Sequence, residues 1–180
     1  MSTPQHLLER YVEAKDLVRP HLMQEIYAPD AVLTFSIATD SITFPARVAG
    51  IAGMTQTLVV DFGARFSRCK TYYVCDSPPQ EGGKIATVPW LVLMREPARA
   101  CLRVGQGHYE WTFEQRGHGV VQVVAMHIHI GRMDAIDDPD GHLLNAAQSA
   151  LPYPWLPPTV MLSEFETLAE ADPALAFLKA

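Results

Sequence analysis

The sequence predicts an α+β fold in which helices come first and an antiparallel sheet follows. Apolar residues recur at helical spacing through the first third of the chain, and they alternate with polar residues through much of residues 67–132. Residues 120–132 are the most strand-like run, and we expect them to form the last strand of a curved sheet. A chain of 180 residues suits one domain with a substantial core.

Three helices are expected before residue 67. Thr3 and Pro4 indicate the start of the first, because a hydroxyl caps a helix and proline suits its first position. Its buried stripe is expected to be Leu7, Leu8, Tyr11, Val12, Ala14 and Val18, with Glu9, Arg10, Glu13 and Lys15 facing water. A second helix, after Pro20, ends at Pro29 and Asp30, and a third covers residues 51–66 with its apolar residues on one face.

Strands are expected at 31–37, 42–48, 69–75, 90–95, 100–115 and 120–132. Pro45 marks the second as an edge strand or a bulge. Gly105 and Gly107 suggest a bend in the long fifth strand, and residues 116–119 read as a hairpin turn into the sixth.

Residues 133–180 are expected to be a C-terminal extension of the 1–132 domain, packed on that domain or on a partner subunit. Helices are expected at 142–150 and 159–171. Residues 152–158 between them should not be regular structure, because four of these seven residues are prolines without an N–H.

Composition excludes several classes of protein. The charges are scattered, with a formal net charge of −6, so neither a nucleic-acid footprint nor a polybasic membrane patch is present. The three cysteines lack paired spacing and the N-terminus does not resemble a signal peptide, so we expect reduced thiols in a cytoplasmic protein. Phosphate-loop, dinucleotide, nucleophile-elbow and zinc-protease motifs are missing, and no cofactor is expected.

Three segments carry a resemblance to a known family: residues 26–32, with Tyr-Ala-Pro-Asp-Ala-Val; residues 49–54, with Gly-Ile-Ala-Gly-Met; and the hairpin of residues 109–130. Their order is similar to that of the nuclear transport factor 2-like superfamily, which includes ketosteroid isomerase, scytalone dehydratase and the SnoaL-like cyclases. The resemblance covers about residues 4–132. It implies an α+β cone, with the N-terminal helices packed in the concave face of a strongly curved, mainly antiparallel sheet.

The resemblance also implies an apolar pocket open at one end of the cone and, commonly, a homodimer through the outer face of the sheet. It does not transfer one function, because the fold hosts isomerases, dehydratases, cyclases and binding proteins. In ketosteroid isomerase an aspartate of the first strand is the base; residues 32–37 here hold no carboxylate, so that mechanism is not expected. Tyr11 falls near a position where the family often has a pocket tyrosine, and the extension could cover the pocket mouth.

His127 and His129 are two residues apart and so point to the same face of their strand. If they face the cone, they could act as a general acid/base pair, with Tyr11 as a hydrogen-bond donor. If they face outward, they could bond across a dimer interface. Such a pair can also chelate a metal ion, but Met133 and Asp134 follow where a further ligand is usual, so no metal site is expected.

His108 and Glu110 alternate with Tyr109, Trp111 and Phe113, so the strand has a polar and an apolar face. The polar face could be half-solvated, or the glycine bend could turn His108 or Glu110 into the cavity as ligand contacts, where the pKa of a carboxylate would be raised. The other residues expected to contact a ligand are Trp90, Trp111, Phe35 and Phe62.

Two functions remain open from the sequence. The first is a cofactor-independent isomerase, dehydratase, other lyase or cyclase that uses His127, His129 and Tyr11 on a small hydrophobic or cyclic compound. The second is a non-catalytic protein that binds a small ligand or assembles as a dimer, suggested by the missing carboxylate and the apolar extension. The face of the sheet that carries the two histidines distinguishes them.

Overall fold

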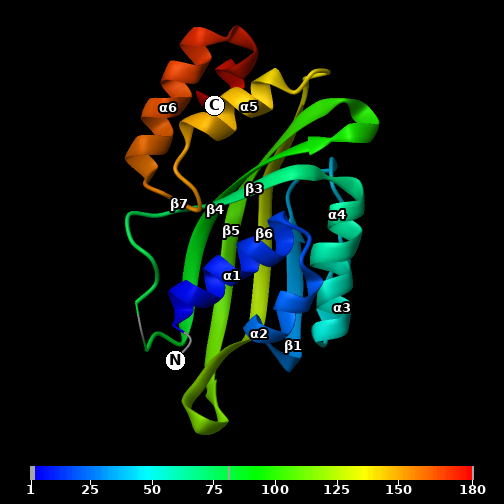
Figure 1. The fold of residues 1–180 in the computed structure, drawn as a ribbon, viewed down its shortest axis with the longest axis vertical. Helices are drawn as coiled ribbons and strands as arrows, with labels where there is room; N and C mark the ends of the chain where they lie inside the picture. The colour runs from blue at the N-terminus through cyan, green and yellow to red at the C-terminus, as the bar shows by residue number, and fades with distance from the viewer. Residues whose placement is uncertain (1–2, 81, 180) are drawn as a thin grey trace.

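A computed structural model describes residues 3–80 and 82–179. Helices from the first third of the chain pack against one face of a single curved sheet, and the C-terminal helices lie at one end of that sheet (Figure 1). The strands are β1 (Tyr27–Ile37), β2 (Arg47–Ala49), β3 (Ser67–Val74), β4 (Ile85–Glu96), β5 (Cys101–Arg116), β6 (Val120–Asp137) and β7 (Trp155–Leu156).

Within the described residues, seven strands form one sheet in the order β2-β1-β6-β5-β4-β3-β7. The pairs β1–β6 and β3–β7 are parallel, and the other neighbours are antiparallel. Several strand predictions need correction. β6 is not the last strand, because β7 follows it, and β6 itself lies within the sheet between β1 and β5. Residues 152–158, which we expected to lack regular structure, contain the short strand β7. Both β4 and β6 also extend beyond their predicted ranges.

The N-terminal helices follow the predicted order. Helix α1 (Pro4–Asp16) is capped by Thr3, whose Oγ1 accepts from the backbone N–H of His6 at 3.2 Å. The 3₁₀ turn η1 (Pro20–Leu22) and α2 (Met23–Ile26) end earlier than expected, because Tyr27 already belongs to β1. The third predicted helix is one helical stretch, α3 (Ile51–Thr55), the π-helical η2 (Gln56–Asp61) and α4 (Phe62–Arg65).

The main core lies between these helices and the inner face of the sheet. It joins Leu7, Leu8, Tyr11 and Val12 of α1 to strand residues such as Trp90, Tyr109, Trp111, Met126 and Ile128. The predicted exposure of two residues, Val18 in the buried stripe and Lys15 facing water, is reversed in the structure. Val18 is 47% exposed, because α1 has ended before it, whereas Lys15 is only 5% exposed, because it has a buried acidic partner.

The segment between β1 and β2 differs from the prediction of a strand at 42–48. Only residues 47–49 pair with β1, and residues 38–46 form a loop. Ile42 is buried in the main core, and the half-buried rings of Phe35 and Phe44 stack with centroids 4.6 Å apart. The loop is tied down at Ser41, whose Oγ donates to the Met133 carbonyl at 2.7 Å.

The extension consists of α5 (His142–Ala150), β7, α6 (Pro158–Ala171) and the 3₁₀ segment η5 (Pro173–Lys179). It forms a second core with the opposite face of the same sheet, where Leu91, Leu93, Leu102 and Val104 alternate with residues of the main core. From the extension come Leu143, Leu144, Ala147, Leu151, Leu156, Phe165, Leu168, Leu175 and Leu178. No helix in the described part of the chain is long and apolar enough to cross a membrane.

Candidate ligand pocket in the cone

The concave face of the sheet encloses a small cavity of about 40 Å³ between α1, the third helical stretch and the loop of residues 38–46. A cavity needs roughly 10–15 Å³ of such volume to hold one water, so this space has room for only a few waters. Its lining is Tyr11, Lys15, Phe35, Ile42, Phe44, Leu58, Phe62, Trp90, Val92, Tyr109, Ile128, Ile130 and Met133.

Most of the lining is apolar, and its polar atoms include two unsatisfied donors. The Tyr11 side chain interacts with that of Tyr109, but its hydroxyl has no hydrogen bond of normal geometry among the described residues. Trp90 Nε1 also has no hydrogen-bond partner among them. Both residues are almost completely buried, Tyr11 at 0% and Trp90 at 4% exposure. Buried polar groups are usually hydrogen-bonded, so two unpartnered donors beside one cavity call for an acceptor inside it.

Lys15 supplies a third donor, and the sequence did not predict it. Its ammonium donates to Asp16 Oδ1 at 2.9 Å and to Cys69 Sγ at 3.3 Å, and it lies 4.4 Å from the centroid of the Phe62 ring. Lys15 is one helical turn beyond Tyr11, and this spacing was the available signal. This spacing did not predict a buried Lys15, because lysine is almost never fully buried without a partner. One of its partners, Cys69, lies on β3 and cannot be inferred from the sequence around Lys15.

Asp16 is the buried partner that holds this cluster together. Its Oδ1 also accepts from Thr71 Oγ1 at 2.9 Å, and its Oδ2 accepts from the Thr71 amide at 2.6 Å. The Tyr153 hydroxyl donates to the same Oδ2 at 3.0 Å, and Trp155 Nε1 donates to Glu9 Oε1 at 2.9 Å. The proline-rich segment of the extension therefore contacts α1. Through Tyr153 it reaches Asp16, the acidic partner of the cavity residue Lys15.

The environment keeps these groups in their protonated forms. Burial raises the pKa of Tyr11 above its usual value. Burial is the largest single effect on Lys15 and would lower its pKa, but the charge and hydrogen bond of Asp16, together with Cys69 and Tyr11, outweigh burial, and the pKa is raised. Burial, reinforced by Asp16, also raises the pKa of the Cys69 thiol to about 12. At neutral pH the cavity therefore meets a phenol and an ammonium, and no carboxylate or imidazole is among its described lining residues.

Four of the residues expected to contact a ligand or substrate are brought together here. Tyr11, Phe35, Phe62 and Trp90 all line the cavity. Trp111 does not; it packs behind Tyr11, with ring centroids 5.1 Å apart, and its Nε1 has no partner among the described residues.

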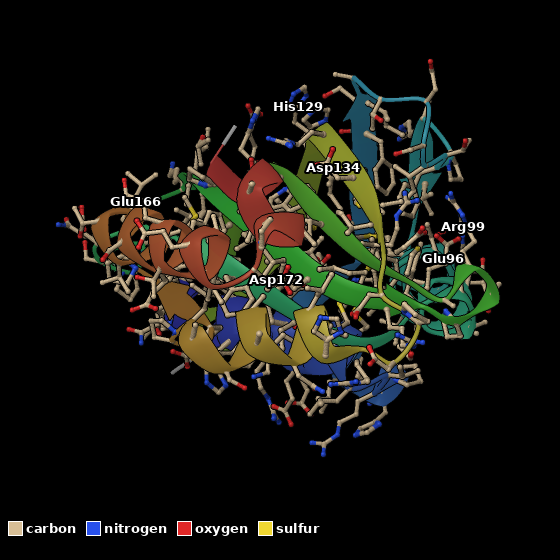
Figure 2. The ribbon with its side chains drawn as sticks, turned by 90° about the horizontal axis from the view of Figure 1, so that it is seen from above. Glu96, Arg99, His129, Asp134, Glu166 and Asp172 are labelled. Carbon is tan, nitrogen blue, oxygen red and sulfur yellow. The ribbon has the colours of Figure 1, made fainter. Side chains whose placement is uncertain are left out.

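His127 and His129 lie on the other face of the sheet. Met126, Ile128 and Ile130 alternate with them and belong to the main core, so the histidines point outward. Figure 2 shows His129 on the side of the sheet away from α1. The structure therefore places both histidines on the outer face of the sheet, and neither lines the cavity. An acid/base pair inside the cone does not fit this geometry.

His108 and Glu110 share that outer face, since Tyr109 and Trp111 between them are in the main core. The glycine bend does not turn them inward, because the extra residue of the bulge, Gly131, belongs to β6: Gln106 pairs with Arg132 and Gly107 with Ile130. They are therefore not contacts of the cavity. The extension covers another part of the outer face, so the predicted homodimer through the sheet stays a prediction for the uncovered part.

Comparison with known proteins shows the fold alone. No family model matches the chain, and no curated protein matches it. Among solved structures, a nuclear transport factor 2-like superfamily protein from Salmonella enterica serovar Typhimurium aligns with a TM-score of 0.57 and 14% identity, over 69% of this chain and 85% of that one.

Two further structures give the same result. A hexachlorocyclohexane dehydrochlorinase, LinA-type3 from Novosphingobium barchaimii, has a TM-score of 0.55 and 14% identity, over 72% of this chain and 85% of its own. A ketosteroid isomerase-like protein from Erwinia carotovora has a TM-score of 0.54 and 11% identity, over 71% and 93%. The predicted resemblance is confirmed at the level of architecture: the chain has the α+β cone fold of the nuclear transport factor 2-like superfamily.

Proposed function

We propose that the chain binds a small, largely apolar molecule that carries one hydrogen-bond acceptor, and that it does so without catalysis. The observation that carries the proposal is the set of donors on the lining of the apolar cavity: the Tyr11 hydroxyl and Trp90 Nε1, which lack partners among the described residues, and the Lys15 ammonium, which is bonded to Asp16 and Cys69. Buried donors without partners favour a ligand that offers a carbonyl or similar oxygen.

Entry of such a ligand requires the cavity to widen, because about 40 Å³ is too small for a cyclic compound. The loop of residues 38–46 is the part of the wall most suited to move. It contributes Ile42 and Phe44, is bonded to the rest of the chain mainly at Ala38, Ser41 and Ala46, and has no regular structure between them. Loops that flank a rigid pocket commonly supply such motion.

The absence of a base among the described lining residues favours binding over proton-transfer chemistry. Lys15 is held protonated by Asp16, and Tyr11 is held neutral by burial. General-base catalysis needs a group that is unprotonated at working pH and within reach of the substrate. The histidines that suggested catalysis lie across the sheet.

The test uses the indole N–H signals of the three tryptophans in a ¹H–¹⁵N NMR spectrum. Cyclohexanone and methylcyclohexane form a matched pair with and without an acceptor. We expect cyclohexanone to bind more tightly and to shift the Trp90 signal, while Trp155, bonded to Glu9, serves as the internal reference. Tyr11→Phe should weaken cyclohexanone binding about 2- to 10-fold, the value of one neutral hydrogen bond, and leave methylcyclohexane unaffected.

Equal affinity for the two compounds, or no shift of Trp90, would contradict the proposed binding mode. Catalysis is tested separately in D₂O. Protein-dependent exchange of the protons next to the carbonyl of cyclohexanone would reveal a base in the pocket and would replace the non-catalytic proposal with an isomerase-like one.

A further inference from the structure

A second group of polar side chains lies on the outer face of the sheet, away from the cavity. His108 of β5 is directly opposite His129 of β6, and Glu110 is directly opposite His127. Side chains paired in this way have Cβ atoms about 4.5–5.5 Å apart. The rings of His108 and His129 stack with centroids 4.7 Å apart, and His108 Nε2 lies 3.8 Å from Glu110 Oε1.

Hydroxyl groups of β1 hold the two histidines of β6. Ser36 Oγ lies 2.8 Å from His129 Nδ1 and 2.8 Å from His127 Nε2. Thr34 Oγ1 lies 2.7 Å from His127 Nδ1. When His129 donates from Nδ1 to Ser36 Oγ, the Ser36 hydroxyl donates to His127 Nε2, and His127 donates from Nδ1 to Thr34 Oγ1. Every hydrogen bond in this chain is then satisfied, and the Nε2 lone pair of His129 is free.

This arrangement distinguishes the roles of the two β6 histidines. Both ring nitrogens of His127 are engaged, whereas Nε2 of His129 has no hydrogen-bond partner among the described residues. Histidines that bind metals almost always donate their other N–H to a fixed partner, which sets the tautomer and aims the ring. Ser36 stands in that relation to His129.

We propose that His108, His129 and Glu110 form a binding site for a divalent first-row transition metal ion. Two imidazoles and one carboxylate are a ligand set for zinc and for ferrous iron, and they leave coordination positions open for water. Magnesium and calcium are disfavoured, because they prefer oxygen ligands. His127 is a positioning residue that acts through Ser36.

Metal binding requires the side chains to move, because the ligand atoms of His108, His129 and Glu110 do not all lie within 4.8 Å of one another in this structure. The stacked imidazoles must tilt until a nitrogen of each points to the same place, since the ring planes now differ by only 26°. His108 and His129 are half-exposed, so the rings have room to turn. The 3.8 Å contact between His108 Nε2 and Glu110 Oε1 would give way to bonds from both side chains to the metal.

The described residues contain a competing cluster, Asp138, Asp140 and His142, whose ligand atoms already lie within 4.8 Å of one another. Its groups are occupied, however. Asp138 is completely buried and accepts from the amides of Leu143 and Leu144, each at 3.1 Å. His142 is bonded to Asp140 at 2.8 Å and to Asp172 at 3.4 Å. This cluster caps α5, and it provides the control.

The experiment is a titration of the full chain with Zn²⁺ by calorimetry, with Co²⁺ absorption reporting the ligand geometry. His129→Ala, His108→Ala and Glu110→Gln should each weaken Zn²⁺ binding by more than about 100-fold. Ser36→Ala should weaken it about 10- to 100-fold, the range for residues that orient a ligand. His142→Ala is the matched control and should change it less than about 3-fold, within the usual scatter of such measurements.

Nitrogen-15 spectra of the histidine rings add a readout of position. Zn²⁺ should shift His108 Nε2 or Nδ1 and His129 Nε2, while the signals of His142 stay unchanged. The proposal is overturned if millimolar Zn²⁺ produces no binding, if His142→Ala abolishes binding, or if His129→Ala retains it. Far-UV circular dichroism of each variant checks that a lost signal is not lost folding.

Discussion

The buried pair of Lys15 and Asp16 gives the sharpest test of how the helices are held in the cone. The side chains of Lys15 and Asp16 are 6% and 1% exposed, and their charged atoms are 2.9 Å apart. In Asp16→Asn the ammonium keeps its buried place but loses the compensating charge. Breaking a buried pair from one side costs about 3–5 kcal/mol, a large part of the roughly 5–15 kcal/mol that stabilises a domain.

The reverse change should cost less, because Asp16 has other donors. In Lys15→Met the carboxylate still accepts from the Thr71 amide and hydroxyl and from Tyr153. Hydrogen bonds to a charged group contribute about 1.5–3 kcal/mol each, so these partners offset much of the loss. We therefore expect Lys15→Met to cost about 1–3 kcal/mol and the double variant to be less damaged than the sum of the two.

The assay is urea unfolding at neutral pH, followed by circular dichroism and tryptophan fluorescence, with m-values compared to confirm a common unfolded state. Glu13→Gln is the matched control on the same helix, since its pairs with Arg10 and Arg19 are partly exposed and should contribute at most about 1 kcal/mol. Equal costs for Asp16→Asn and Glu13→Gln, or strict additivity in the double variant, would refute the reasoning.

Three further predictions concern other parts of the fold. Gly107→Ala should destabilise the protein by about 1–3 kcal/mol or more, because the added Cβ would lie 1.9 Å from the His129 carbonyl oxygen. In the control Gly117→Ala the added Cβ meets nothing within 4 Å, so this variant should be nearly neutral. The free energy of unfolding from chemical denaturation distinguishes the two. Leu144→Ala, in the second core, should cost about 2–5 kcal/mol, against less than about 0.5 kcal/mol for the exposed Leu162→Ala; similar melting curves would contradict that core. Burial raises the pKa of Tyr11, Tyr27, Tyr73 and Tyr109, so the folded state keeps protons that the unfolded state loses above about pH 10. Stability should therefore fall as pH rises, by about 1.4 kcal/mol per pH unit per group. The pKa of Lys15 is also raised, so Lys15 acts in the same direction above the usual lysine pKa of about 10.5. Unchanged unfolding free energy between about pH 8 and pH 11 would argue against buried tyrosines.

Much of the secondary structure follows from local pattern. The capping Thr3, the prolines and the spacing of Leu7, Tyr11 and Ala14 predict α1, and alternation predicts the strand that contains His108 and Glu110. Residues 42–46 of the loop were included in the predicted strand of residues 42–48 because Ile42 and Phe44 are apolar. In the structure these side chains reach the cavity from irregular backbone, which alternation cannot distinguish from a strand.

Local alternation predicts that His127 and His129 share one face, since alternate residues of a strand point the same way. It could not predict that this face is the outer one, that β6 lies beside β1, or that His108 and Glu110 stand opposite the pair, because these depend on how distant strands pair. The same holds for Lys15, whose burial depends on Cys69 of β3 and on Asp16. Local spacing sets which side chains of one segment point together. Which segments pair, and which face they bury, depends on the apolar area removed from water over the whole chain.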